Sequence, residues 1–165
     1  MKAFHANIAM VESTVDKYAD MLIRIAFQNT RNYSDAEDIV QEVLTKLFVS
    51  SDTISDEAHL KAWLIRVTIN RCHDLARSPW HKRKVEMPPD YPDYTDSEKG
   101  ILQEVLALPE KYRNVIYLYY FEGYKLHEIA DILSENINTV GSQLQRGRTI
   151  LKSYLEGDDH HASAL

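Results

Sequence analysis

Two consecutive apolar patterns of helical period run through residues 34–77, and they constrain the fold more than any other feature of the chain. The first pattern keeps its apolar side chains on one face of a helix, and it consists of Val40, Val43, Leu44 and Leu47. The second covers most of the helix circumference, and it consists of Leu60, Leu64, Ile65, Val67, Ile69, Cys72, Leu75 and Ala76. A helix that is apolar on most of its surface is buried among neighbouring elements. We therefore expect an all-α fold organised around this pair of helices.

The first helix of the pair has an acidic polar side. Its start at residues 34–37 (SDAE) matches a capping box. The polar side chains are Asp35, Asp38, Gln41, Glu42 and Thr45. The helix dipole favours carboxylates in the first turn, which is sufficient to explain Asp35 and Asp38. Gln41 and Glu42 lie beyond that turn, so they either meet a partner or have no role.

The second helix carries a narrow polar stripe that includes an aromatic ring. At about 100° per residue, one face collects Trp63, Arg66, Asn70, Asp74 and Arg77. An indole beside guanidinium groups and a carboxamide can stack on unpaired bases and hydrogen-bond to their edges. The alternative is that Trp63 folds back into the core and that the arginines are only solvated. Periodicity does not decide between the two.

Charge is distributed unevenly along the chain, although the net charge is only −6. Residues 61–84 hold seven basic side chains and one acidic one, whereas residues 85–98 hold five acidic side chains and no basic one. Because screening acts over about 8–10 Å, local patches decide contact with nucleic acid more than the net charge does. The cluster at residues 81–84 (HKRK) either touches DNA phosphates or is merely solvated. The net charge itself argues against a protein that coats DNA without selectivity.

The chain is expected to form two small helical domains joined by a flexible linker. Residues 1–84 make the first domain and residues 97–156 the second. Residues 85–96 (VEMPPDYPDYTD), which are acidic and rich in proline, make the linker, and residues 157–165 a disordered tail.

The second domain has the pattern of a helix-turn-helix. Its two helices are expected at residues 126–133 and 139–155, with Ala130 small enough to allow their close approach. The second helix exposes one polar stripe, formed by Asn138, Ser142, Gln145, Arg146 and Thr149. A helix that projects such residues from this motif suits the major groove of DNA.

These segments carry a resemblance to a known family. The stretch DAEDIVQEV followed by KAWLIRVTINRCHDLAR resembles the core of bacterial sigma factors, in particular the extracytoplasmic-function group of the sigma-70 family. After the linker, LPEKYRNVIYLYYFEGYKLHEIADILSENINTVGSQLQRGR is similar to the C-terminal helix-turn-helix of that family. The resemblance implies a transcription initiation factor that docks on the clamp and flap of core RNA polymerase. The residues that it assigns to polymerase docking are Asp35, Asp38, Gln41, Glu42 and Thr45.

The resemblance also implies two promoter contacts. It assigns the minus-ten element to Trp63, Arg66, Asn70, Arg71, Asp74, Arg77, Lys82 and Arg83, and it places a pocket for a flipped base at the loop of residues 50–56 and the helix after it. It assigns the minus-35 element to Lys125, Asn138, Thr139, Ser142, Gln143, Gln145, Arg146 and Arg148. The family usually has basic residues at Gly141 and Gln143 and an apolar one at Glu135, so we expect weak, salt-sensitive contact with the minus-35 element. In the family the linker enters the polymerase, although a plain spacer would have the same composition.

Other functions find little support in the residues. The single cysteine, Cys72, excludes an intramolecular disulfide and a zinc site built from cysteines. Residues 127–131 (HEIAD) begin like a zinc-protease motif but have aspartate at the second ligand position. We therefore expect no enzyme activity, no metal and no cofactor. The N-terminus has no signal pattern and the apolar run 115–121 is too short to span a bilayer, so we expect a cytoplasmic protein without membrane insertion.

A second interpretation stays open. The chain could be a stand-alone DNA-binding regulator that uses only its helix-turn-helix, with the first domain as a sensor or a dimerisation unit. Binding to core RNA polymerase separates the two interpretations. Under the first, the resemblance also implies an anti-sigma protein as an inhibitory partner.

Overall fold

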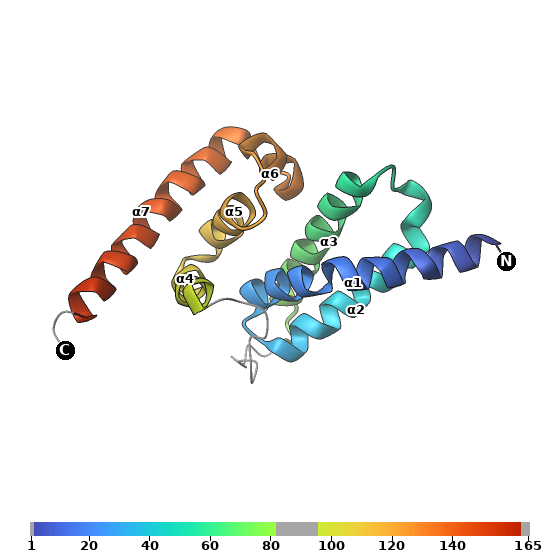
Figure 1. Cartoon of the computed structure of the whole chain (residues 1–165), viewed down its shortest axis with the longest axis horizontal. Coiled ribbons are helices and arrows are strands. Elements are labelled where there is room, and N and C mark those ends of the chain that lie inside the picture. Colours follow the sequence, from blue (N-terminus) through green and yellow to red (C-terminus); the bar gives the residue numbers. More distant parts are fainter. Residues whose placement is uncertain (1, 82–95, 163–165) are drawn as a thin grey trace. The chain divides into compact units, whose positions relative to one another are not determined.

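The computed structural model describes residues 2–81 and 96–162, and every regular element within these ranges is a helix (Figure 1). The expected all-α fold is therefore confirmed. The chain separates into two compact units, residues 1–89 and residues 90–165. Lys82 and Arg83, expected to contact DNA, and the expected linker up to residue 95 lie outside the described residues.

The first unit is built from three long helices, α1 (Lys2–Thr30), α2 (Tyr33–Ser50) and α3 (Glu57–Arg77), with a short 3-10 turn, η1 (Ser51–Thr53), before α3. Each of the three helices packs against the other two, and α1 and α2 run antiparallel side by side (Figure 1). Their shared core includes Leu22, Ile25, Phe27, Ile39, Val43, Leu47, Leu64, Ile65 and Ile69. The apolar patterns of α2 and α3 thus face this core, except that Ala76, expected on the buried side of α3, is exposed.

The start of α2 differs from the capping box expected at residues 34–37. Arg31 ends α1 in the left-handed region at φ 54°, and Asn32 becomes the N-cap of α2. The side-chain oxygen of Asn32 accepts a hydrogen bond from the Asp35 amide at 2.9 Å, which satisfies one of the amides left over at a helix start. The hydroxyl of Thr30 donates to the Ala26 carbonyl at 2.9 Å, and the Asn32 amide donates to that hydroxyl at 3.3 Å. The turn is therefore set by Thr30 and Asn32, and the expectation of a Ser34 cap is wrong.

The two ends of α3 follow from local side-chain chemistry. The carboxylate of Asp56 caps the start by accepting from the His59 amide at 2.7 Å. At the other end, Ser78 takes an extended conformation, which is the preference of a residue that precedes proline. Pro79 therefore ends the helix as expected from the sequence.

The second unit contains α4 (Asp96–Ala107), α5 (Glu110–Tyr120), α6 (Leu126–Leu133) and α7 (Ile137–Ala162). Its core is formed mainly by α5, α6 and the first half of α7, with Val115, Ile116, Tyr117, Leu118, Ile129, Ile132, Val140 and Leu144 buried. Gly123, at φ 72°, lies between α5 and α6, and α6 and α7 form the expected helix-turn-helix. The helix α7 continues to Ala162, so the expected disordered tail is helical from residue 157 to that point.

None of the helices within the described ranges combines the length and apolar character that a membrane span requires. The same part of the chain holds no group of three or more histidine, cysteine, aspartate or glutamate side chains placed to bind a metal ion.

Candidate nucleic-acid interface

The polar stripe of α3 lies on the solvent side of the first unit. Asn70, Asp74 and Arg77 are exposed, whereas Trp63 and Arg66 are half-buried. Trp63 is not among the fully buried side chains, so its indole is not sealed in the interior, although most of the residue's surface is covered. The stripe therefore presents an amide, a carboxylate and a guanidinium to solvent, with an indole partly accessible further along the same face.

A small cavity opens beside Asn70, between α2 and α3. Its volume is about 170 Å³, and it is lined by Glu42, Val43, Lys46, Val67, Asn70, Arg71 and Asp74. Pockets that hold drug-sized ligands are larger, roughly 300–1,000 Å³, so this cavity has room for a group no larger than about one base. Two valines offer apolar contact, while the other lining residues carry hydrogen-bonding groups. Trp63 and Arg66 do not line it.

A second cavity of about 200 Å³ lies at the loop before α3. It is lined by Met10, Ser13, Thr14, Lys17 and Tyr18 of α1 and by Ile54, Ser55, Asp56, Glu57 and Leu60. No residue of the α3 stripe takes part in it. The loop and the stripe, which the resemblance combines in one pocket, are therefore associated with separate cavities.

Glu57 holds the start of α3 against α1 at this second cavity. Its carboxylate is 2.6 Å from the Lys17 ammonium and also accepts a hydrogen bond from the Tyr18 hydroxyl. These two hydrogen bonds, from Lys17 first and Tyr18 second, lower the pKa of Glu57. Burial and the Glu57 contact raise the pKa of Tyr18 to about 12. The polar contacts thus fix the position of the loop relative to α1.

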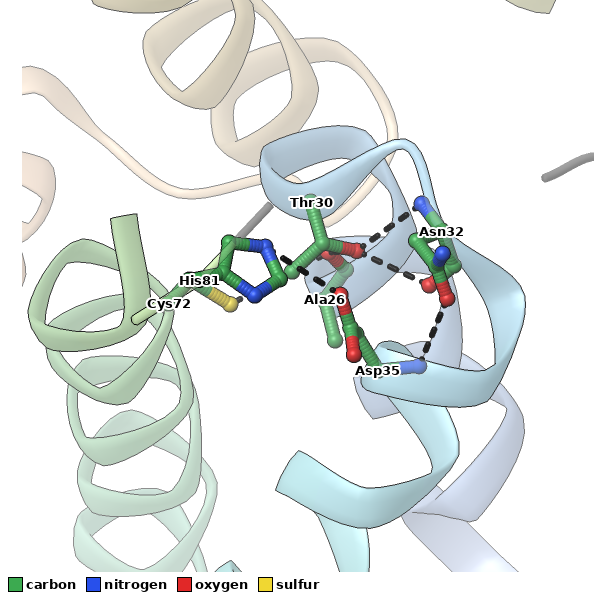
Figure 2. A network of polar contacts seen from close by, with 6 residues as sticks. All are labelled: Ala26, Thr30, Asn32, Asp35, Cys72 and His81. Carbon is green, nitrogen blue, oxygen red and sulfur yellow. Dashed lines mark hydrogen bonds and ion pairs between the residues drawn. The ribbon is translucent and has the colours of Figure 1, made fainter. Parts of the chain in front are cut away.

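The acidic side of α2 is divided by the structure. Asp38, Gln41, Glu42 and Thr45 are exposed on one face. Asp35 is half-buried, and its Oδ2 atom lies 3.3 Å from Nε2 of His81, the residue that follows the turn after α3 (Figure 2). The structure therefore groups four of the five residues expected to dock on the polymerase, and it turns the fifth, Asp35, toward another part of the same unit.

Glu42 and Arg71 form an ion pair that the sequence did not reveal. Nε of Arg71 donates to the Glu42 carboxylate, and Nη2 of Arg71 lies 3.4 Å from Oε1 of Glu42. The hydrogen bond to Glu42 raises the pKa of Arg71. The family resemblance assigns Glu42 to polymerase docking and Arg71 to the minus-ten element, so the pair connects the expected docking face on α2 with the expected DNA face on α3. Their spacing of 29 positions leaves no periodic signal by which the sequence could reveal it.

In the second unit, α7 exposes most of the residues expected to read DNA. The exposed residues are Asn138, Thr139, Ser142, Gln145, Arg146 and Arg148, together with Lys125 before α6. Gln143 is only half-exposed, and its Oε1 atom is buried without a hydrogen-bond partner. The helix-turn-helix therefore presents its polar stripe to solvent, while Gln143 turns partly inward.

Two features of the surface were missed by the sequence analysis. An open groove of about 690 Å³ runs along α7 and is lined by Tyr120, Gly141, Leu144, Gln145, Arg148, Thr149, Leu151, Lys152 and Leu155. Trp80, which follows α3, is 90% exposed. The Ser-Pro-Trp-His sequence at residues 78–81 is a turn signal that could have drawn attention to Trp80.

Comparison with known proteins gives the same two regions in the same order. The family model for sigma-70 region 2 matches residues 14–82, and the family model described as sigma-70, region 4 matches residues 99–151. The chain is 29% identical to RNA polymerase sigma factor SigV of Bacillus subtilis, with 96% of this chain and 99% of that protein covered. It is 30% identical to ECF RNA polymerase sigma factor SigW of Bacillus subtilis, with 86% of each covered.

A solved structure has the same fold. The sigma factor RpoE of Bartonella quintana, determined in complex with the anti-sigma factor NepR, superposes with a TM-score of 0.67. The match is 23% identical in sequence and covers 88% of this chain and 96% of that one. With two family regions matched in order and a relative that is 30% identical over most of both chains, this chain belongs to the sigma-70 family of RNA polymerase sigma factors, in its ECF group.

Proposed function

We propose that this protein is an alternative sigma factor that binds core RNA polymerase and directs it to specific promoters. The observation that carries the proposal is the exposed α3 stripe with a base-sized cavity beside Asn70. The order of the two matched regions supports it, as do relatives that bear the name of RNA polymerase sigma factors. A sigma factor catalyses no reaction of its own. It would act in the cytoplasm, where the polymerase is found.

Capture of a flipped minus-ten base would occur in the cavity beside Asn70. We choose this cavity over the one at the loop because it opens on the same stripe as Asp74. Flipping a base costs a few kcal/mol of unstacking, which a preformed cavity with hydrogen-bonding walls offsets. Trp63 lies two helical turns away, about 10 Å along the axis, so it would stack on a neighbouring unpaired base. Arg66 and Arg77 would contact the strand on either side.

Docking on the polymerase clamp would use the four exposed residues of α2, namely Asp38, Gln41, Glu42 and Thr45. Asp35 is left out because it faces His81. Engagement of Glu42 by a basic group of the polymerase would release Arg71 for a DNA phosphate. Docking and promoter binding are thereby coupled through one ion pair.

The second unit would contact the flap of the polymerase and read the minus-35 element through α7. The residues proposed for DNA contact are Lys125, Asn138, Thr139, Ser142, Gln145, Arg146 and Arg148. The partly inward Gln143 and the helix-weakening Gly141 support a weak contact that salt disrupts. An inhibitory anti-sigma protein would cover part of these surfaces, as the structural relative from Bartonella quintana was determined with such a partner.

Retention of the full-length protein on purified bacterial core RNA polymerase tests the proposal. We expect a stable complex that co-elutes in size-exclusion chromatography. A stand-alone DNA-binding regulator would elute separately from the polymerase. The absence of a complex would therefore favour that alternative and reject the proposal.

A double variant tests the docking face. We expect Gln41→Ala combined with Glu42→Ala to abolish core binding while the helical circular dichroism signal stays unchanged. The matched control is Arg71→Gln, which breaks the same ion pair from the α3 side. If the control loses core affinity as well, the effect comes from the broken pair, and α2 is not the docking face.

A further inference from the structure

The turn after α3 places a tryptophan in solvent. Trp80 is 90% exposed and stands between Pro79, which is also exposed, and His81. Tryptophan has the largest apolar surface of any side chain, and leaving it in water gains nothing for folding. A partner that covers the indole would therefore gain the favourable free energy of removing this apolar surface from water.

The turn that carries Trp80 is held from both sides. The Ser78 amide donates to the Leu75 carbonyl at 3.1 Å, and the His81 amide donates to the Ser78 carbonyl at 3.2 Å. The second bond closes a β-turn with Pro79 in the position that proline favours. The indole is therefore displayed at the tip of a defined turn.

The side chain of His81 adds a second attachment. Figure 2 shows its imidazole reaching toward the start of α2, where Nε2 lies 3.3 Å from Oδ2 of Asp35. Only 17% of the His81 side chain and 24% of the Asp35 side chain are exposed. Asp35 is itself held at the start of α2, because its amide donates to the Asn32 side chain. The contact is an ion pair only when the imidazole is protonated, and Oδ2 of Asp35 has no hydrogen-bond partner among the described residues, so the two part-buried side chains place the turn beside the start of a helix that is distant in sequence.

The chemistry around Trp80 favours a nucleic acid as the partner. Arg77 is exposed one turn before it, and the sequence continues after His81 with Lys82, Arg83 and Lys84, which lie outside the described residues. A flat aromatic ring beside cations matches bases next to phosphates. A membrane surface also attracts tryptophan and cations, but it requires a broad apolar helix face, and the exposed side of α3 carries Asn70 and Asp74.

We propose that Trp80 stacks on an unpaired base of single-stranded DNA and that Asp35 and His81 are positioning residues for it. Trp80 then extends the surface of α3 beyond the end of the helix, past Arg77. The inference rests on the proposed function, because it adds one stacking position to the same strand-binding surface. It also gives Asp35 a role within the first unit in place of a contact with the polymerase.

The emission of Trp80 tests the stacking directly. In the full-length Trp63→Phe variant, Trp80 is the only tryptophan, since the chain has two. We expect a mixed-sequence single-stranded oligodeoxynucleotide to quench this emission strongly, and the same strand annealed to its complement to quench it weakly. Equal quenching by both DNA forms, or no quenching at concentrations where a labelled strand is bound by the variant, would overturn the proposal. Vesicles with anionic lipid are the third probe. If vesicles shift the Trp80 emission and single-stranded DNA does not quench it, the proposal is also overturned.

Affinity measurements give the size of the effect. We expect Trp80→Ala to weaken binding to the single strand by about tenfold, and Trp80→Phe to restore most of it. The matched control is Val49→Ala, which removes another exposed apolar side chain of the first unit (78% exposed) and should change nothing. If Trp80→Ala lowers affinity for core polymerase and leaves DNA binding intact, the indole contacts the polymerase and the proposal is wrong.

The positioning role has its own readout. In the Trp63→Phe background, we expect His81→Ala or Asp35→Ala to lower the fluorescence anisotropy of Trp80 and to weaken single-strand binding, with core affinity unchanged. Unchanged anisotropy together with reduced core affinity in Asp35→Ala would remove Asp35 from this role. Failure of the wild-type protein to bind core polymerase would reject the proposed function. The quenching experiment would still show whether Trp80 stacks on single-stranded DNA.

Discussion

Glu57 joins the start of α3 to α1 through the Lys17 ammonium and the Tyr18 hydroxyl. These contacts lower the pKa of Glu57 from its ordinary value of 4.5. A carboxyl group whose pKa is lower in the folded state stabilises the fold above its unfolded pKa, and this contribution is lost as the pH falls through the folded value. We therefore expect Glu57→Gln to be less stable than wild type near neutral pH, with the difference shrinking below about pH 4.5.

Urea denaturation at a series of pH values, followed by circular dichroism, measures this difference. Glu12→Gln, which changes an exposed carboxylate of α1, serves as the control and should show no comparable trend. A destabilisation by Glu57→Gln that persists undiminished in acid would mean that packing, and not the charged contacts, holds this end of α3.

At single residues, the sequence predicts which side chains share a surface better than it predicts which of them form hydrogen bonds or ion pairs with one another. The stripe on α3 follows from helical period alone, and Asn70, Asp74 and Arg77 are exposed as expected. The Glu42–Arg71 pair could not be predicted, because it depends on how α2 and α3 pack. Ser34 and Asn32 both have side chains that can cap a helix, and it is Asn32 that has the extended backbone of a cap and accepts a hydrogen bond from the Asp35 amide. The contribution of these residues to polymerase and DNA binding stays a prediction.

Gly147 brings α7 and α5 together in the second unit. A Cβ atom at this position would lie 3.0 Å from Cγ1 and 3.2 Å from Cδ1 of Ile116, and 3.2 Å from Cβ of Tyr112. Ile116 and Tyr112 are both buried, so they have little room to move. A Cβ atom at Gly141, on the same helix, would meet nothing within 4 Å. The two glycines therefore form a natural pair for comparison.

We expect Gly147→Ala to be less stable than Gly141→Ala by about 1–3 kcal/mol, the usual cost of overpacking. The gain in helix propensity, about 1 kcal/mol, is common to both variants and cancels in the comparison. Thermal unfolding of the two full-length variants and the wild type gives the difference. Equal stability of the two variants would show that Ile116 can move aside at little cost.

At the scale of elements, helical periodicity predicts where a helix forms and which of its faces is buried. The exact ends of a helix depend instead on the capping residues and turns next to it. The positions of α2, α3 and α6 follow from their apolar patterns, as does the helix-turn-helix. The last turns of α7 beyond Leu155 have no apolar repeat, so the sequence offers no sign that the helix continues past residue 156. Ala76 lies in the last turn of α3 and is exposed, whereas Cys72, one turn earlier, is buried.

Each of the two units has its own hydrophobic core, and the whole molecule is a pair of modules on one chain. We expect residues 1–89 and residues 90–165, made as separate fragments, each to keep a cooperative helical fold. If both modules hold the promoter in the polymerase complex, separating them should weaken promoter retention by about 10²–10⁴-fold, the usual range for lost avidity. Circular dichroism of the fragments and filter retention of the assembled complexes measure the two effects. Retention that matches the intact chain would mean that one module carries all of the promoter affinity.

The chain has one cysteine, and Cys72 is 2% exposed, with its sulfur 3.9 Å from the Ala26 carbonyl oxygen of α1 (Figure 2). A thiol reagent can reach that sulfur only when α3 separates from α1. The rate at which the thiol is modified therefore reports how often the first module opens. The second module has no thiol and contributes no signal.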